Sequence, residues 1–268
     1  MNRALWDEWV DINAASDFYG LEEFREGGTK LRPYELEEVG PVAGKSLLHL
    51  QCHFGMDTFS WAREGARVTG VDFSPRGIEV ARRLADELGI AATFIESDVY
   101  ELPSKLEDRF EVVYTSRGVL NWLPDLHRWA QVAAHFLDPG GILYITELHP
   151  IVNVFDDEST EPILRLRYPY WTPARPMEFD NIGSYADRTK RVTVPHEYDW
   201  SHSLGEIVTA IADAGLSIEF LHEFDFAEWH IPPLVERDGD VWRMPPGRFG
   251  DPEGQLPLSF SLRASKPG

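Results

Sequence analysis

The chain lacks the features that direct a protein into a membrane or an oxidising compartment. It contains one cysteine, Cys52, and therefore cannot form an intrachain disulfide. No apolar run approaches the roughly 20 residues that a bilayer-crossing helix requires. The first residues, MNRALWDEWVDINAA, are acidic and aromatic, without the basic and then apolar order of a signal peptide. We therefore expect a cytoplasmic protein with no membrane partner.

Basic side chains are also scarce. The chain has 25 Lys and Arg against 45 Asp and Glu, which gives a formal net charge of −20 at pH 7. A field of this sign repels the phosphates of nucleic acids and of anionic membranes. The densest basic segment, residues 187–191, is short and has acidic neighbours. This composition predicts no nucleic-acid partner and favours a small molecule as the ligand.

Short apolar runs alternate with helical patterns from residue 44 onward. Strands are expected at 45–50, 67–72, 91–96, 110–115, 142–147, 216–222 and 257–264, and helices at 58–63, 76–88, 126–137 and 204–214. Residues 138–141, Asp-Pro-Gly-Gly, are expected to form a turn. The alternation predicts an α/β fold: a Rossmann-like, doubly wound, mostly parallel seven-stranded sheet with an antiparallel edge strand and helices on both faces.

Three segments fall outside this alternation. Residues 1–43 are rich in aromatic and acidic side chains and are expected to form an N-terminal lid. The remaining residues, 44–268, are expected to form one domain with insertions at about 150–198 and 225–255. Both insertions are rich in proline and aromatic residues and are too long for simple loops, so we interpret them as caps over the sheet edge.

The segment HLQCHFGMDT, residues 49–58, follows the first expected strand and permits several interpretations. His49 and His53 could share a metal, but His49 belongs to a strand, where positions i and i+4 do not converge, and no further ligand stands at a suitable spacing. Cys52 could act as a nucleophile beside His53, although a buried structural role fits it better. The favoured interpretation is a cofactor loop with no metal.

Asp72 indicates which cofactor this loop would hold. It ends the second expected strand, 17 residues after Gly55, close to the spacing of about 20 at which an acid binds ribose hydroxyls in Rossmann-like folds. The alternative is an acid that only stabilises the following helix N-terminus. Gln51 and His53 occupy positions where a diphosphate site requires glycine, which disfavours NAD. S-adenosylmethionine has a ribose and no phosphate, and so fits better.

Several fragments in this order resemble the class I S-adenosylmethionine-dependent methyltransferases, particularly the small-molecule type. They are the loop ending at Gly55, VDFS at 71–74, SDV at 97–99, FEVVYTS at 110–116 and LDPGG at 137–141. The glycine-rich loop departs from the family pattern, because His49 replaces its acid and Gln51 and His53 replace its first two glycines. The resemblance covers residues 44–150 and implies S-adenosylmethionine as the cofactor.

The resemblance also implies roles for individual residues. The backbone of Leu50, Gln51 and Gly55 would pass the methionine part of the cofactor. Gln51 and His53 would either contact the methionine carboxylate with their side chains or narrow the loop. Further cofactor contacts are implied as follows: Asp72 with the ribose, Phe73 with the adenine face, Asp98 and the Val99 amide with the adenine amine, and Ser116 near the sulfonium.

Residues outside the cofactor loop are candidates for the acceptor side. His149, after the fifth strand, could take a proton from an attacking hydroxyl or amine, or could instead be bonded to backbone where the cap begins. Tyr19, Trp122 and Tyr170 are expected in the substrate pocket. The resulting hypothesis is methylation of a small organic molecule on oxygen or nitrogen. The alternatives are a nucleoside-binding protein without methyl transfer and an RNA or protein methyltransferase.

Overall fold

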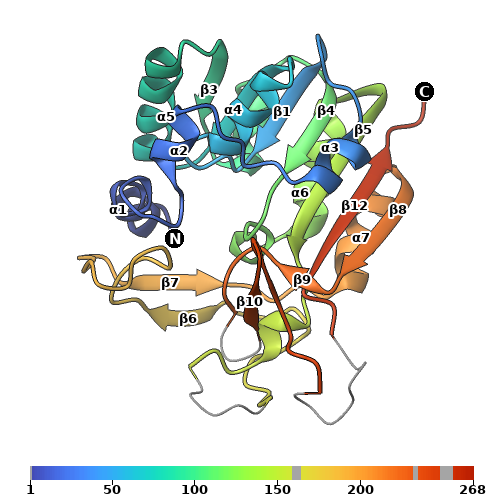
Figure 1. The fold of residues 1–268 in the computed structure, drawn as a ribbon. Helices are drawn as coiled ribbons and strands as arrows, with labels where there is room; N and C mark the ends of the chain where they lie inside the picture. Colours follow the sequence, from blue (N-terminus) through green and yellow to red (C-terminus); the bar gives the residue numbers. More distant parts are fainter. Residues whose placement is uncertain (1, 159–163, 232–234, 248–255) are drawn as a thin grey trace.

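The computed structural model describes residues 2–158, 164–231, 235–247 and 256–268, and its centre is a single twisted sheet (Figure 1). The strand order is β3-β2-β1-β4-β5-β12-β8. The strands are β1 Ser46–Leu50, β2 Arg67–Asp72, β3 Ala92–Glu96, β4 Phe110–Thr115, β5 Leu137–Leu148, β8 Ser217–Phe224 and β12 Ser259–Ser265. Neighbours from β3 to β5 pair in parallel, whereas β12 runs antiparallel to both β5 and β8. The predicted doubly wound sheet is therefore confirmed, with its antiparallel strand one position inside the β8 edge.

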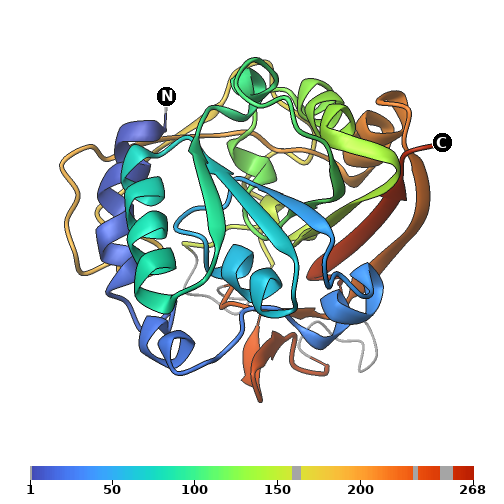
Figure 2. The same cartoon turned by 90° about the horizontal axis from the view of Figure 1, so that it is seen from above.

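Helices cover both faces of this sheet (Figure 2). One face packs against α6 (Leu126–Phe136) and α7 (Leu204–Asp213), and the other against α3 (Pro33–Val39), α4 (Met56–Arg63) and α5 (Pro75–Leu88). In β1 the neighbouring residues Leu47 and Leu48 point into opposite layers, and both are fully buried. A strand buried on both sides needs apolar residues at successive positions, which is why β1 is a continuous apolar run.

Local signals set the ends of α5. The Ser74 hydroxyl accepts a hydrogen bond from the Gly77 amide at 2.9 Å, and Pro75 occupies the first helical position. Gly89 ends the helix in the left-handed conformation, with φ +63°. The helix boundaries predicted from the sequence agree with these residues because caps are local interactions.

The expected turn at residues 138–141 is wrong. These residues form the beginning of β5, which starts at Leu137 and is irregular in its pairing with β4. The Gly140 amide donates to the Lys266 carbonyl at 2.8 Å, and the Lys266 amide donates to the Gly141 carbonyl at 2.9 Å. The end of the chain therefore extends this segment by pairing with it, an interaction between residues that are far apart in sequence.

The remaining elements lie beside the sheet or beyond the carboxyl ends of its parallel strands (Figure 1). The N-terminal segment forms α1 (Arg3–Ala14) and α2 (Leu21–Arg25) ahead of α3, and short 3-10 turns occur at η1 Val99–Ser104, η2 Leu120–Trp122 and η3 Val152–Val154. The segment after β5 contains the hairpin β6 (Met177–Asp180) and β7 (His196–Asp199). A small sheet consists of β9 (Phe226–Ala227), β10 (Glu236–Asp238) and β11 (Val241–Arg243). Within the described ranges, no helix combines the length and apolar character needed to cross a bilayer.

A substitution at Gly70 tests how closely the sheet packs in the layer that faces α5. A Cβ atom added at this position in β2 would lie 2.8 Å from the Phe94 ring and 2.9 Å from Cys52 Sγ, both of which are buried. Overpacking of this kind costs about 1–3 kcal/mol. We expect Gly70→Ala to lower the free energy of unfolding by that amount, measured by urea denaturation.

The matched control is Gly205→Ala in α7, where the nearest atom to an added Cβ is Ser203 Oγ at 3.9 Å. Alanine in a helix is more stable than glycine by about 0.5–1 kcal/mol, so this variant should be as stable as the parent or more so. Equal stability of the two variants would contradict the close packing around Gly70.

Candidate functional site

A cavity of about 1670 Å³ lies beyond the carboxyl ends of the parallel strands. This is the edge at which open α/β sheets bind their ligands. Its lining combines residues from the ends of β1, β2, β4 and β5 with residues from α1 and from the segments after β5 and β8. Of the residues that the sequence nominates, these line the cavity: Tyr19, Gln51, His53, Gly55, Asp72, Phe73, Asp98, Val99, Ser116 and Trp122.

The loop after β1 keeps a glycine-like backbone although two of its glycines are absent. Gln51 and His53 have φ values of +57° and +51°, and Gly55 has φ +86°. Side chains other than glycine disfavour this region by roughly 1–2 kcal/mol per residue, so tertiary contacts must hold the loop in place. The peptide groups of the loop are therefore oriented as a glycine-rich loop would orient them.

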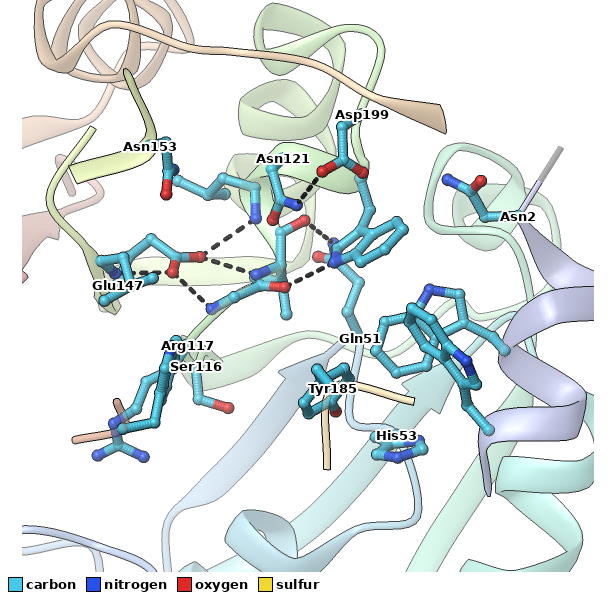
Figure 3. Close-up of a pocket in the computed structure, with 18 of the residues that line it drawn as sticks. Asn2, Gln51, His53, Ser116, Arg117, Asn121, Glu147, Asn153, Tyr185 and Asp199 are labelled. Carbon is cyan, nitrogen blue, oxygen red and sulfur yellow. Dashed lines mark hydrogen bonds between the residues drawn. The ribbon is translucent and has the colours of Figure 1, made fainter. Parts of the chain in front are cut away.

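The side chain of Gln51 is directed toward α6 and the loop after β4 (Figure 3). Its Oε1 accepts a hydrogen bond from Trp129 Nε1 at 3.1 Å, and its Nε2 donates to the Val119 carbonyl at 3.4 Å. Trp129 is almost completely buried, so its indole N–H needs this acceptor. These hydrogen bonds offset part of the unfavourable conformational free energy of the left-handed backbone at Gln51.

The side chain of His53 joins the loop to α1. Asn13 Nδ2 lies 3.1 Å from His53 Nε2, and the imidazole packs edge-on against Trp6 with ring centroids 5.1 Å apart. Burial lowers the pKa of His53 to about 3, which makes the ring neutral at physiological pH. A neutral ring that receives the Asn13 amide at Nε2 carries its proton on Nδ1.

Asp72 closes the loop against β2. Its Oδ2 accepts the His53 amide and its Oδ1 accepts the Ser74 amide, each at 2.8 Å. The residue is buried, and burial raises the pKa of its carboxyl to about 7 in spite of these two hydrogen bonds. The Phe73 amide also lowers this pKa as a backbone hydrogen-bond donor. A carboxylate has about four lone pairs, so these amides leave it some capacity to accept a ligand hydroxyl.

The ends of β3 and β2 meet beside Asp72. The Ser97 amide donates to the Asp72 carbonyl at 2.9 Å, and Asp98 Oδ1 accepts the Tyr100 amide at 2.9 Å as the cap of η1. Asp98 is exposed, whereas Val99 is buried. Polar and apolar groups thus alternate along this wall of the cavity.

His49 and Ser116 connect the ends of β1 and β4. His49 Nε2 lies 3.1 Å from Ser116 Oγ, and His49 Nδ1 lies 2.8 Å from Thr58 Oγ1. All three side chains are buried. His49 and Ser116 line the cavity, whereas Thr58 does not. His49 and His53 therefore face different partners. Among the described residues, His, Cys, Asp and Glu side chains do not gather in a group that could hold a metal ion.

Glu147, at the end of β5, is a cavity residue that the sequence did not single out. Its carboxylate accepts the amides of Gly118, Val119 at 2.8 Å, Leu120 at 3.2 Å and Leu148 at 2.7 Å (Figure 3). Burial raises the pKa of Glu147, and the four amides oppose that shift. The Glu147 carboxylate thereby fixes the loop between β4 and η2, whose residues line the cavity.

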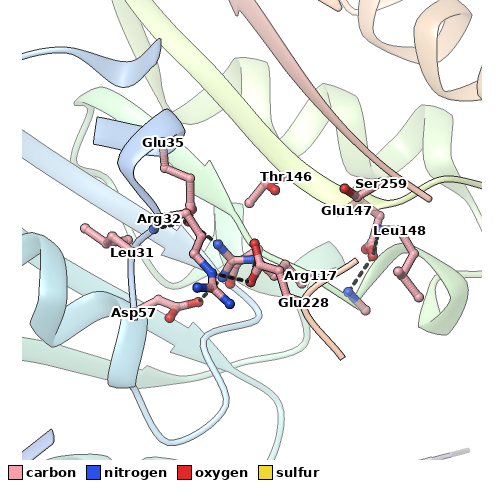
Figure 4. A network of polar contacts seen from close by, with 12 residues as sticks. Leu31, Arg32, Glu35, Asp57, Arg117, Thr146, Glu147, Leu148, Glu228 and Ser259 are labelled. Carbon is pink, nitrogen blue, oxygen red and sulfur yellow. Dashed lines mark hydrogen bonds and ion pairs between the residues drawn. The ribbon is translucent and has the colours of Figure 1, made fainter. Parts of the chain in front are cut away.

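Arg117 was also missed, and it centres a buried network of charges (Figure 4). Its guanidinium pairs with Glu35 of α3, with Glu228 Oε2 at 2.6 Å and with Asp57 Oδ2 at 3.8 Å. Burial raises the pKa of Glu35, and the charge of Arg117 opposes that rise. A buried cation needs such partners, so the network ties α3, α4 and the segment after β9 to the end of β4. The acidic partners of Arg117 are far apart in the sequence, so no local pattern predicts this network.

Three nominated residues do not line the cavity. Leu50 is fully buried in the core between the sheet and α6. His149 Nδ1 accepts the Ile151 amide at 3.1 Å, and its Nε2 lies 2.9 Å from Glu223 Oε1. The Tyr170 hydroxyl accepts the Leu204 amide at 3.3 Å, and the ring packs on Trp171. These three residues lie outside the cavity lining, and the roles predicted for them toward the cofactor and the acceptor stay predictions.

The strand order and the site at its carboxyl edge define the class I S-adenosylmethionine-dependent methyltransferase fold. Residues 47–141 match the family model described as a methyltransferase domain. This part of the chain is therefore similar to the S-adenosylmethionine-dependent methyltransferases, as the sequence resemblance implied.

The relatives and structural neighbours agree with this assignment. A ubiquinone biosynthesis O-methyltransferase from Vibrio cholerae is 35% identical over 135 residues, covering 50% of this chain and 55% of the relative. The enzyme of the same name from Photorhabdus laumondii is 32% identical, covering 43% and 48%. The chain thus spans about half the length of the curated relatives it matches.

Two solved structures share the fold over most of the chain. An S-adenosylmethionine-dependent methyltransferase from Mesorhizobium loti has a TM-score of 0.54 at 19% identity, covering 90% of this chain and 100% of that one. The glycopeptide N-methyltransferase MtfA in complex with S-adenosylmethionine has a TM-score of 0.56 at 15% identity, covering 87% and 92%.

Glu147→Gln tests the carboxylate that holds the loop after β4. An amide nitrogen would face backbone N–H groups that need an acceptor, and leaving buried donors unpaired costs about 1–3 kcal/mol. We expect the free energy of unfolding to fall by that amount in chemical denaturation. The control is Glu101→Gln, an exposed residue 3.9 Å from Lys105, which should change stability by less than about 0.5 kcal/mol. An equal change in the free energy of unfolding for both variants would contradict the role of Glu147.

Proposed function

We propose that this protein transfers a methyl group from S-adenosylmethionine to a hydroxyl or amine of a small organic molecule. The observation that carries the proposal is the buried Asp72 carboxylate, which lines the cavity at the end of β2 and is held there by the His53 and Ser74 amides. It stands beside a loop whose backbone is left-handed at Gln51, His53 and Gly55. A ribose diol beside a backbone-lined loop fits this arrangement.

The lining residues suit the parts of the cofactor in turn. Asp72 would accept the two ribose hydroxyls, and Phe73 would lie against the adenine with Asp98 and Val99 at its edge. The peptide groups of Gln51 and Gly55 would face the methionine part. When bound, S-adenosylmethionine supplies an electrophilic methyl group on its sulfonium. The chain would contribute binding, alignment and exclusion of water.

The cavity and the overall charge support a small acceptor. A cavity of about 1670 Å³ has room for a cofactor and a further small molecule, and a net charge of −20 disfavours RNA. The names of the relatives specify an O-methyltransferase in ubiquinone biosynthesis and a glycopeptide N-methyltransferase. These names favour oxygen or nitrogen as the acceptor atom here too.

We extend the proposal to residues 1–43 and the insertions, which would close the cavity from solvent. Asn2 pairs with the backbone of Tyr198 in β7 through two hydrogen bonds of 2.8 and 2.9 Å. Asn13 bonds the Ser184 and Tyr185 side chains of the same insertion. These contacts join α1 to the first insertion, and Asn2, Ser184 and Tyr185 also line the cavity. Residues 159–163, 232–234 and 248–255 of the insertions lie outside the described residues.

The function is tested by binding and then by turnover. Isothermal titration with S-adenosylhomocysteine should give a measurable affinity, and incubation with S-adenosylmethionine and a panel of phenols, alcohols and amines should release S-adenosylhomocysteine. Asp72→Ala should weaken binding at least tenfold, while the exposed control Asp213→Asn should not change it. Absence of binding would refute the cofactor assignment, and binding without turnover on any compound would favour a nucleoside-binding protein.

The elevated pKa of Asp72 predicts a pH dependence of cofactor binding. The ionised carboxylate accepts both hydroxyl protons, and the pKa of about 7 means that the free protein loses this form as the pH falls below 7. Affinity for S-adenosylhomocysteine should be constant above about pH 8 and decline toward pH 5.5 by up to about tenfold per pH unit. Titrations in Asp72→Asn should show weak affinity without this dependence. The same slope in that variant would assign the effect to another group.

A further inference from the structure

The hairpin of β6 and β7 presents two carboxylates to the cavity that the cofactor assignment does not use. Glu197 and Asp199 both belong to β7, and both line the cavity. Successive residues of a strand alternate between its two faces, so positions 197 and 199 share one face. Phe179 and Met177, which pair with them in β6, line the cavity as well. This face of the hairpin therefore forms a cavity wall that combines two acids with apolar side chains.

Each of the two carboxylates receives a hydrogen bond from an asparagine. Asn121 Nδ2 donates to Asp199 Oδ2 at 3.1 Å (Figure 3), and Asn181 Nδ2 donates to Glu197 Oε2. The other oxygen of Asp199, Oδ1, is buried and has no hydrogen-bond partner among the described residues. Buried polar atoms are almost always hydrogen-bonded in folded proteins. The unpartnered oxygen, on a side chain that lines the cavity, therefore points to a ligand group that donates to it.

The charges around this pair favour a cationic ligand. In the part of the chain that the structure describes, neither Glu197 nor Asp199 has a Lys, Arg or His partner, and the further charge near Glu197 is the acid Asp157. His196, the neighbour of Glu197 in sequence, pairs with Asp180 at 2.6 Å instead. The cavity lining as a whole contains eleven Asp and Glu side chains against five Lys and Arg side chains. An anionic ligand group at this wall would be repelled.

Burial also makes a cation favourable here. It raises the pKa of both the Glu197 and the Asp199 carboxyl, because it disfavours their charged forms and no neighbouring cation compensates. A positively charged group bound against the two carboxylates would supply that compensation.

An ammonium group matches the geometry of this wall. It carries one positive charge and three N–H donors, and positions two apart on a strand lie about 7 Å from each other, a separation that one ammonium can bridge. Met177 and Phe179 would contact the hydrocarbon part of the same ligand. A metal ion needs more ligands, and the described residues contain no group of three or more His, Cys, Asp and Glu side chains that could hold one.

We propose that Glu197 and Asp199 form a subsite that binds a protonated amine of the methyl acceptor, so that the acceptor is a cationic small molecule. This rests on the proposed function and specifies its substrate class. The ammonium group is held by charge and by hydrogen bonds to Asp199 Oδ1 and to the Glu197 carboxylate. A protonated nitrogen has no lone pair, so the methyl group goes to another hydroxyl or amine of the same molecule.

Binding tests the subsite without turnover. Isothermal titration measures the affinity of the full chain, with and without S-adenosylhomocysteine, for amines and their hydroxyl isosteres: tyramine and tyrosol, phenethylamine and phenethyl alcohol, butylamine and butanol. We expect at least one amine to bind at least tenfold more tightly than its isostere. If no amine binds more tightly than its isostere, the proposal is overturned.

Neutral variants locate the preference. For the amine with the strongest preference, Asp199→Asn and Glu197→Gln should each lower the affinity at least fivefold and leave the affinity for the hydroxyl isostere within twofold of the parent. An amide removes the charge and keeps the size of the side chain. Circular dichroism checks that each variant is folded, and Glu197→Gln carries the test alone if Asp199→Asn is not.

The matched control is Glu178→Gln in β6 of the same hairpin. Glu178 is exposed and does not line the cavity, so both affinities should match the parent. An equal loss of amine affinity in this control would assign the preference to the overall charge of the protein. Equal losses for amine and isostere in Asp199→Asn and Glu197→Gln would assign a structural role to the carboxylates. Either result would overturn the proposal.

The cofactor is measured separately, because S-adenosylhomocysteine also carries an ammonium group. Its affinity in Asp199→Asn and Glu197→Gln should stay within twofold of the parent. A tenfold loss would assign the subsite to the cofactor and overturn the proposal. If the parent does not bind S-adenosylhomocysteine at all, the proposed function fails on its own, and the amine preference measured without it still decides whether Glu197 and Asp199 bind a cation.

Discussion

The hydrogen bond from the His53 amide to the Asp72 carboxylate is the interaction on which the site depends. It joins the loop after β1 to the end of β2 and holds the loop in a conformation that its side chains disfavour. A carboxylate buried at a strand end is itself costly, and two amides at 2.8 Å compensate part of that cost. The loop and the acid stabilise each other, and both face the cavity.

The same principle organises the other strand ends. Each carries a buried polar or charged side chain whose partners come from another element: His49 from α4 and β4, Arg117 from α3 and the segment after β9, and Glu147 from the loop after β4. Buried polar groups tolerate few arrangements, since an unpaired member costs more than a satisfied pair contributes. The cavity is therefore bordered by side chains that are locked before any ligand arrives.

Particular elements show how far the sequence predicts this architecture. The apolar run at β1 and the helix at 76–88, which is α5 in the structure, were both predicted, because periodicity and capping act within a few residues. An antiparallel strand was also predicted, and it is β12, one position inside the edge. The part of the chain that carries the resemblance near Gly55 and Asp72 matches a methyltransferase domain. The turn expected at 138–141 is a strand instead, because the chain end pairs with it. Local patterns could not report that distant partner.

By itself, the sequence determined the layered α/β fold, the similarity of residues 47–141 to a methyltransferase domain and the strand ends at which a ligand would be sought. These follow from spacing along the chain, and spacing is a local property. Only the tertiary structure decided where the side chains point. The Gln51 side chain bonds Trp129, and the His53 side chain bonds Asn13 of α1. His49 contacts Ser116, and His149 lies outside the cavity lining. Each of these contacts depends on a partner that is far away in sequence and that folding brings close. Because such partners hold the loop, Gln51 and His53 can occupy the glycine positions of HLQCHFG and keep the left-handed backbone.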